Sequence, residues 1–102
     1  MALTPSETTA LEQSIQSALS RIPLLNDEWN QRKFVKQYEI KDPNDFIYGY
    51  ALGFIANAFN NTIYLSQGRS PTEDETKEAQ EITFQRCAEI RNAIALRRYQ
   101  LR

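Results

Sequence analysis

The pattern of apolar and charged residues is organised around one uncharged segment, residues 46–68, FIYGYALGFIANAFNNTIYLSQG. Before it, apolar residues recur at helical spacing between Leu11 and Ile22, and after it an amphipathic pattern runs from about residue 72 to 101 without glycine or proline. This pattern predicts a single all-α domain over residues 1–102. Because the connections between the segments are short, we expect a four-helix up-down bundle with an uncharged central third helix and a long fourth helix.

Start and stop signals define the first two expected helices. Thr4, Pro5 and Glu7 form a capping box with proline at the first helical position, and Pro23 is expected to end the first helix. A second helix is expected from about Asp27 to Glu39, although its apolar residues share a face only in part.

Similar signals bound the other two helices. Asp42 and Pro43 predict the start of the central helix, and Gly68 is a suitable left-handed stop. Ser70 and Pro71 predict the start of the fourth helix, which at about 30 residues would be roughly 45 Å long.

The central segment is apolar around most of its circumference, with Phe46, Tyr50 and Leu65 on one broad apolar face, which is typical of a helix buried by protein or by lipid. Six polar residues in its C-terminal half leave too short an apolar stretch for a transmembrane span, so we expect a protein-buried helix. One strip of this helix carries small or polar residues at spacings of four, three and four, namely Gly49, Gly53, Ala56 and Asn60. Because glycine in a helix costs about 1 kcal/mol relative to alanine, we expect the strip to admit a close neighbouring helix, within the fold or across a dimer. A groove for a small ligand and a membrane packing face are the alternatives.

The last helix is predicted to mediate self-association. A rod of about 45 Å is longer than a small domain, so its C-terminal turns, with Ile94 and Leu101, should project and pair with a second copy. A weak seam at alternating spacings of four and three supports this prediction, formed by Thr83, Cys87, Ile90, Ile94, Arg97 and Leu101.

Two arginines, Arg91 and Arg98, fall within the apolar arc of the last helix. Their stems can lie flat with the charged heads in water, they can pair with an acid of another helix or subunit, or they can bind an anionic ligand. In an antiparallel dimer, Arg98 could reach Glu89 of the partner.

The composition limits the possible chemistry. The chain has no histidine and one cysteine, which excludes serine–histidine and cysteine–histidine catalysis, an internal disulfide and multi-cysteine metal sites. Cys87 lies within the apolar arc and is expected to be an inert thiol. The acidic residues at the start of the last helix have neither a histidine nor a calcium-loop glycine beside them, so we expect a solvated face and no metal or other cofactor. A net charge of −1 does not favour nucleic acid as a partner, and the N-terminus does not resemble a signal peptide.

These observations favour a non-catalytic, cytoplasmic interaction or assembly protein that is homo-oligomeric, most simply a homodimer, with a further protein partner that the sequence does not identify. The alternatives are nucleic-acid binding through the arginine-rich C-terminal helix and small-ligand binding at the strip that contains Gly49 and Gly53. The candidate interface or ligand residues are Gly49, Gly53, Ala56, Asn60, Arg91, Ile94, Arg98 and Leu101.

Overall fold

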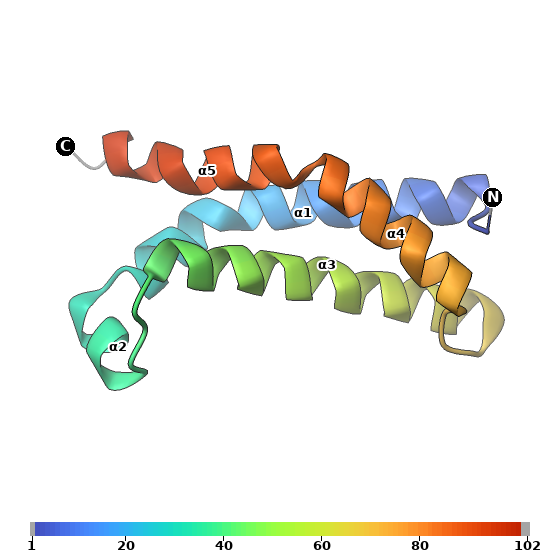
Figure 1. Cartoon of the computed structure of the whole chain (residues 1–102), viewed down its shortest axis with the longest axis horizontal. Coiled ribbons are helices and arrows are strands. Elements are labelled where there is room, and N and C mark those ends of the chain that lie inside the picture. The colour runs from blue at the N-terminus through green and yellow to red at the C-terminus, as the bar shows by residue number, and fades with distance from the viewer. Residues whose placement is uncertain (1, 101–102) are drawn as a thin grey trace.

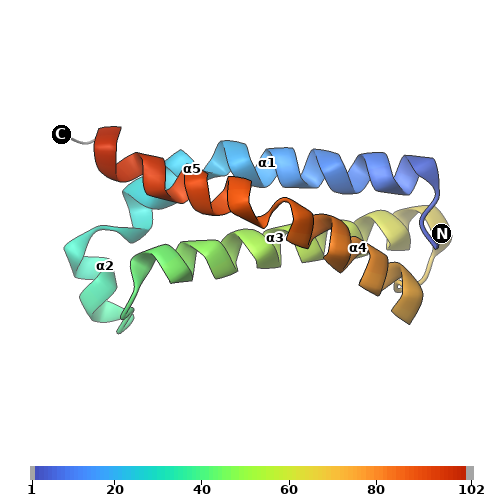
Figure 2. The same ribbon diagram turned by 45° about the horizontal axis from the view of Figure 1, so that its top comes forward.

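The computed structural model describes residues 2–100, and the side chains of residues 2–96. This part of the chain has no strand and forms five helices: α1 (Pro5–Trp29), α2 (Arg32–Gln37), α3 (Pro43–Gln67), α4 (Glu73–Gln85) and α5 (Cys87–Gln100). The all-α class is therefore confirmed. The arrangement is made of three long rods, because α1 and α3 lie antiparallel, and α4 and α5 follow each other end to end across them (Figures 1 and 2).

The core lies where α1, α3 and α5 meet, and each helix contributes one apolar stripe to it. Because these stripes follow the helical repeat, one side of each rod is buried and the other sides face solvent. The stripes consist of Leu11, Ile15, Ala18 and Ile22 on α1, Ile47, Ala51, Ile55, Phe59 and Ile63 on α3, and Ile90 and Ile94 on α5.

The buried face of α3 is narrower than its composition predicted. Phe46, Tyr50 and Leu65, which the apolar pattern placed on the buried face, are exposed. The reason is geometric: α1 and α5 cover only one side of α3, and no further helix among the described residues covers the other side.

The expected caps of α1 and α3 are present. The hydroxyl of Thr4 accepts from the main-chain N–H of Glu7, whose carboxylate in turn accepts from the N–H of Thr4. Asp42 caps α3 by accepting from the N–H of Asn44 and of Asp45, and Gly68 ends it in the left-handed conformation, with a φ of 66°.

The cap of α4 differs from the expected one. Thr72, rather than Ser70, occupies the cap position, and its hydroxyl accepts from the N–H of Glu75, 3.2 Å away. The Glu75 carboxylate accepts from the N–H of Thr72 at 2.7 Å, which completes the capping box. Ser70 with Glu73 and Thr72 with Glu75 both match the capping-box pattern, and the structure forms the second pair.

Pro23 does not end the first helix, so that prediction is wrong. α1 continues to Trp29 with the proline on its exposed side. Proline removes one helical hydrogen bond, but the apolar stripe of α1 continues past it: Asn26 is buried, and Leu25 and Trp29 pack against the core. Tertiary burial thus outweighs the local cost.

The expected helix from Asp27 to Glu39 is divided between two elements. Its first residues complete α1, which ends where the Asn30 side chain donates to the main-chain oxygen of Asn26. Only residues 32–37 form α2, and Glu39 adopts a positive φ of 54°. Asparagine competes for main-chain hydrogen bonds, which explains the early end of the helix.

The long fourth helix is interrupted at Arg86, which separates α4 from α5. The main-chain oxygen of Thr83 accepts from the N–H of Arg86 at 3.0 Å, a tighter turn than that of an α-helix. The Thr83 hydroxyl donates to the oxygen of Ala79 at 2.8 Å, a contact that tends to bend helices. This interruption sets α4 at an angle to α5: α4 crosses over α3, whereas α5 packs against both α1 and α3 (Figure 2).

Ion pairs hold α4 in this position, since few of its side chains are buried. The guanidinium of Arg69 lies 2.7 Å from the carboxylate of Glu75, and Arg86 pairs with both Glu12 and Glu89. The chain N-terminus adds a contact, because the N–H of Leu3 donates to Glu78 at 3.1 Å.

No helix in the described range has an apolar stretch sufficient to cross a bilayer.

Candidate interaction surface

The side of α3 that faces away from the core carries a continuous row of exposed residues. Six of them follow one another at spacings of four, three, four, three and four, which is the seam spacing of paired helices. We call this row the α3 strip, and it consists of Phe46, Tyr50, Gly53, Asn57, Asn60 and Tyr64.

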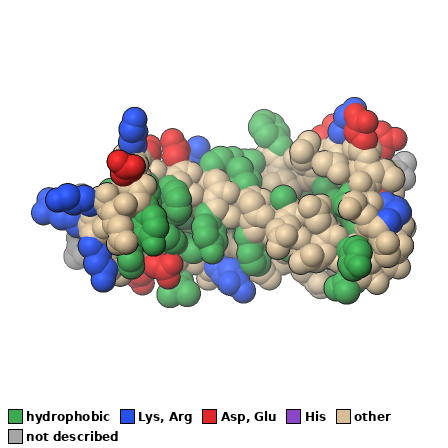
Figure 3. Space-filling model, turned by 90° about the horizontal axis from the view of Figure 1, so that it is seen from below, with side chains coloured by type: hydrophobic (Ala, Val, Ile, Leu, Met, Phe, Trp, Pro, Cys, Tyr) green, Lys and Arg blue, Asp and Glu red, His purple; other side chains and the backbone are tan. Residues whose placement is uncertain are grey.

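Aromatic rings lie toward both ends of the α3 strip, and the residues at its centre are small or polar. Phe46, Tyr50 and Tyr64 are 36, 48 and 62% exposed. No residue of the strip is charged, and Figure 3, which looks onto this side of the molecule, shows hydrophobic and uncharged polar atoms over much of it. Lys and Arg side chains gather in that view at the end where α2 lies. Apolar rings exposed in an uncharged row are typical of a surface that another protein covers.

The glycines of α3 do not accommodate a helix of the same chain. A Cβ atom placed on Gly49 or Gly53 would have no non-local neighbour within 4 Å among the described atoms. The predicted close approach is therefore not made inside the fold, and its other form, contact across a dimer, stays a prediction. Ala56 and Asn60, the other two residues of the predicted strip, are likewise exposed.

An aromatic cluster closes one end of the α3 strip. The ring of Trp29 lies 4.9 Å from that of Phe46, 5.8 Å from that of Phe34 and 5.7 Å from that of Tyr38, measured between centroids. These contacts fix the Phe46 ring in place while part of it stays exposed. This end of the strip is consequently a preformed apolar platform.

A hollow of about 360 Å³ adjoins the strip on the side toward α4. It lies between α3 and the end of α4, so the interruption at Arg86 shapes it. Phe84 stands at its edge with 77% of its surface exposed. Its walls are mostly apolar, and the lining residues are Tyr48, Leu52, Ala56, Gln80, Thr83, Phe84 and Cys87.

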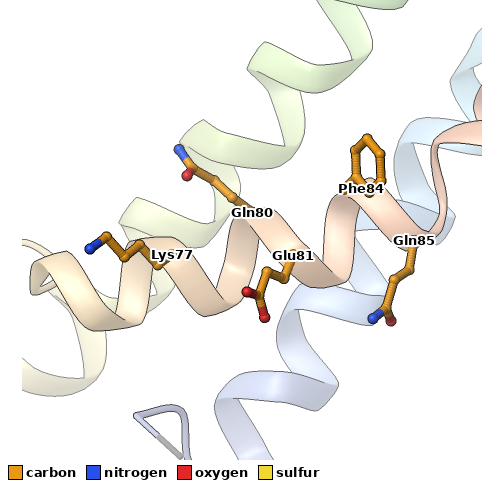
Figure 4. Close-up of a pocket in the computed structure, with 5 residues that line it drawn as sticks. All are labelled: Lys77, Gln80, Glu81, Phe84 and Gln85. Atoms are coloured by element: carbon orange, nitrogen blue, oxygen red, sulfur yellow. The ribbon is translucent and has the colours of Figure 1, made fainter.

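A second hollow lies on α4 alone. Figure 4 shows that its lining residues, Lys77, Gln80, Glu81, Phe84 and Gln85, all come from this one helix, with Phe84 pointing away from Glu81 and Gln85. A depression that one helix face forms has no opposing wall, so it offers no enclosed binding site. Phe84 also lines the first hollow, where α3 supplies the opposing wall.

Arg91 contacts α3. Of the three roles expected for it, the structure shows pairing with an acid on another helix. Its guanidinium lies 2.7 Å from the carboxylate of Asp45 and 3.7 Å from the centre of the Tyr48 ring. The hydrogen bond to Asp45 raises the pKa of the guanidinium further above its usual range. These contacts join the middle of α5 to the start of α3.

Ile94 is buried and is not part of an exposed seam, so that prediction is wrong. Its side chain is 2% exposed, and Ile90 in the preceding turn is fully buried. The four-three pattern predicted that the fourth helix pairs with a second copy. Its residues Ile90 and Ile94 instead pack inside the chain, against α1 and α3. The Arg98 side chain and Leu101 lie outside the part of the structure that is described.

The remaining polar candidates are accounted for by local contacts. Cys87 is half-buried, and its thiol donates to the main-chain oxygen of Thr83 at 3.4 Å. Glu75 pairs with Arg69, which lowers the pKa of the carboxyl to about 2. Within residues 2–96, no group of three or more acidic or cysteine side chains is placed to hold a metal ion.

Sequence reasoning singled out Gly53 and Asn60 of the α3 strip and missed its aromatic members. It assigned Phe46 and Tyr50 to the core because it treated the broad apolar face that makes up most of the circumference of α3 as buried. The four-three spacing from residue 46 to 64 was the signal that could have identified them. That spacing becomes informative only if another stripe of the same helix is recognised as the buried one.

Comparison of the chain with protein-family models, with curated proteins and with solved structures finds no match.

Proposed function

We propose that this protein is a non-catalytic assembly protein that self-associates through the α3 strip. The observation that carries the proposal is an uncharged row of six exposed residues, at seam spacing, with aromatic rings toward both ends. The sequence-based expectation of a homo-oligomer is retained, while the surface assigned to it moves from the fourth helix to α3. A reducing compartment such as the cytoplasm fits a chain with a single cysteine.

The dimensions of α3 indicate how strong the association should be. Its 25 residues form a rod of about 37 Å, so a contact about 10 Å wide covers roughly 400 Å² on each copy. Specific interfaces of standard size bury about 800 Å² per partner. Exposed residues beside the strip, Leu65 and Phe84, can add to the contact. We therefore expect an interface at the small end of the range, with a dissociation constant on the order of micromolar.

An arginine in the centre of the strip tests this function. Gly53→Arg should abolish association, because it places a long charged side chain where the two helices meet. Since no described side chain contacts Gly53 in the monomer, the fold should be retained. Gln16→Arg, on the exposed side of α1, adds the same charge elsewhere and should associate as the wild type does. Equal association of both variants, measured by light scattering, would contradict the proposal.

Binding of a small apolar ligand is the second candidate function, and the hollow between α3 and α4 is the observation that favours it. A volume of about 360 Å³ lies within the range of small-molecule sites. Nucleic-acid binding through α5 has less support, because Arg91 is already paired with Asp45. An apolar fluorescent probe that brightens with the wild type and not with Ala56→Trp, which fills the hollow, would support the ligand function.

A further inference from the structure

We infer that two copies of this chain pair their α3 strips antiparallel, with a twofold axis at the level of Ile55. This inference rests on the proposed function and adds to it the orientation and register of the dimer. Three independent features of the surface support it, namely the order of side chains along the strip, their hydrogen-bonding capacity and the charges at its two ends.

The strip is complementary to itself when its direction is reversed. Phe46 and Tyr64 lie nine residues on either side of Ile55, Tyr50 and Asn60 lie five residues on either side, and Gly53 and Asn57 lie two. In an antiparallel pair centred on Ile55, each of these residues therefore meets its counterpart on the partner. A twofold axis repeats each contact, as closed dimers require.

Each of the three levels combines side chains that fit. Phe46, which the Trp29 cluster holds in place, would pack against the exposed Tyr64 of the second copy. The Tyr50 hydroxyl can donate to the side-chain oxygen of Asn60 across the interface. Gly53 leaves space for the amide of Asn57, and a polar side chain at such a seam position favours one register over others.

A parallel pair lacks this complementarity. It would place Gly53 against Gly53 and leave a gap there, whereas Tyr50 would meet Tyr50 and each asparagine its own copy. Antiparallel helix dipoles also attract each other, and parallel ones repel. Packing and dipoles thus favour the reversed orientation.

The charges at the two ends of α3 favour the same orientation. The start of α4 lies at the same end of the molecule as the C-terminal end of α3 and carries exposed Glu73 and Asp74, although Glu73 pairs with Lys77 (Figure 1). At the opposite end, α2 carries Arg32, Lys33 and Lys36 and no acid, although Glu39 and Asp42 follow it along the chain. An antiparallel pair brings the acidic start of α4 toward α2 of the partner. A parallel pair brings two acidic ends together.

Thiol cross-linking distinguishes the two orientations. In a Cys87→Ser background, Tyr50→Cys and Asn60→Cys are prepared separately, oxidised alone and as a mixture, and the products are identified by mass. The antiparallel register places position 50 of one copy opposite position 60 of the other. It separates like positions by about 15 Å along the axis, too far for a disulfide bond. The mixture should therefore give a heterodisulfide at least tenfold faster than either variant alone gives a homodisulfide.

Two controls keep the result interpretable. Gln16→Cys, on the exposed side of α1, sets the rate of cross-linking by random collision. Phe46→Cys mixed with Tyr64→Cys repeats the test where like positions are about 27 Å apart, and this pair keeps Tyr50 and Asn60 intact.

The possible outcomes separate the register from the function. Homodisulfides of Asn60→Cys that form as fast as the mixed product would overturn the antiparallel register. A mixed product no faster than the Gln16→Cys control, in a protein whose mass is that of a dimer, would also overturn it and leave the proposed function in place. A wild-type protein that stays monomeric would contradict the proposed function itself.

Discussion

The side-chain amide of Asn26 donates a hydrogen bond to the main-chain oxygen of Ile94, 3.3 Å away, inside the core. This contact fastens the last turns of α1 to the middle of α5, and Asn26 is almost fully buried. The amide oxygen of the same residue has no hydrogen-bond partner among the described residues. A buried polar atom without a partner costs about 1–3 kcal/mol, while a satisfied neutral hydrogen bond contributes about 0.5–1.5 kcal/mol.

The first prediction compares these two quantities. Asn26→Leu removes the unpartnered oxygen together with the hydrogen bond, and the Ile94 oxygen keeps the bond that a helix makes to the residue four positions later. The free energy of unfolding, measured in urea, should therefore stay within about 1 kcal/mol of the wild type or rise. Asn26→Ala is the matched control, because it leaves a cavity and should be less stable than Asn26→Leu. A loss above about 2 kcal/mol for Asn26→Leu would show that the amide is required for stability.

The second prediction concerns the open surroundings of Gly53. Gly53→Ala should raise the free energy of unfolding of the monomer by about 0.5–1 kcal/mol, because alanine favours the helix and its Cβ meets no non-local atom within 4 Å. The measurement is urea unfolding at a protein concentration low enough to keep the protein monomeric. Gly49→Ala, one turn earlier on the same helix, should behave alike. Destabilisation of both would mean that another part of the chain packs on this face.

The third prediction concerns stability in acid. The hydrogen bond and charge of Arg69 lower the pKa of Glu75 from its ordinary 4.5 to about 2, with a further contribution from the N–H of Thr72. A lowered pKa in the folded state stabilises the protein fully above about pH 4.5, and this contribution disappears as the pH falls toward 2. Glu75→Gln should therefore reduce the loss of melting temperature between these two pH values.

A comparison with a second carboxylate makes this test specific. Glu89, whose pKa is also lowered, by Arg86, contributes in the same direction, so Glu75→Gln should flatten the acid dependence only in part. Glu73→Gln, an exposed change in the same turn as Glu75, should leave the dependence close to that of the wild type. An unchanged acid dependence in Glu75→Gln would contradict the assigned role of the Arg69 pair.

Local signals in the sequence predicted some helix ends correctly and missed others. The caps at Thr4 and Asp42 and the stop at Gly68 depend on neighbouring residues, and all three are present. The predictions that the first helix ends at Pro23 and that the fourth helix is uninterrupted at Arg86 were wrong, because whether a helix continues at these residues depends on tertiary contacts. Burial of Asn26 carries α1 past the proline, and Arg86, which interrupts a segment that contains neither glycine nor proline, pairs with Glu12 of α1.

The candidate site was less predictable than the helices for the same reason. Whether Tyr50 or Ile94 lies on the surface depends on how many rods pack around α3 and α5. A fourth complete helix would cover more of α3, and three rods leave one of its sides open. Apolar spacing alone cannot separate a stripe that packs within the chain from one that packs against another chain.

The mass of the wild-type protein in solution tests the central claim most directly. Sedimentation equilibrium from about 1 to 300 µM covers the range in which an interface of this size associates. We predict a mass that rises with concentration from 11.8 kDa toward twice that value. A mass that stays at 11.8 kDa over the whole range would contradict self-association through the α3 strip.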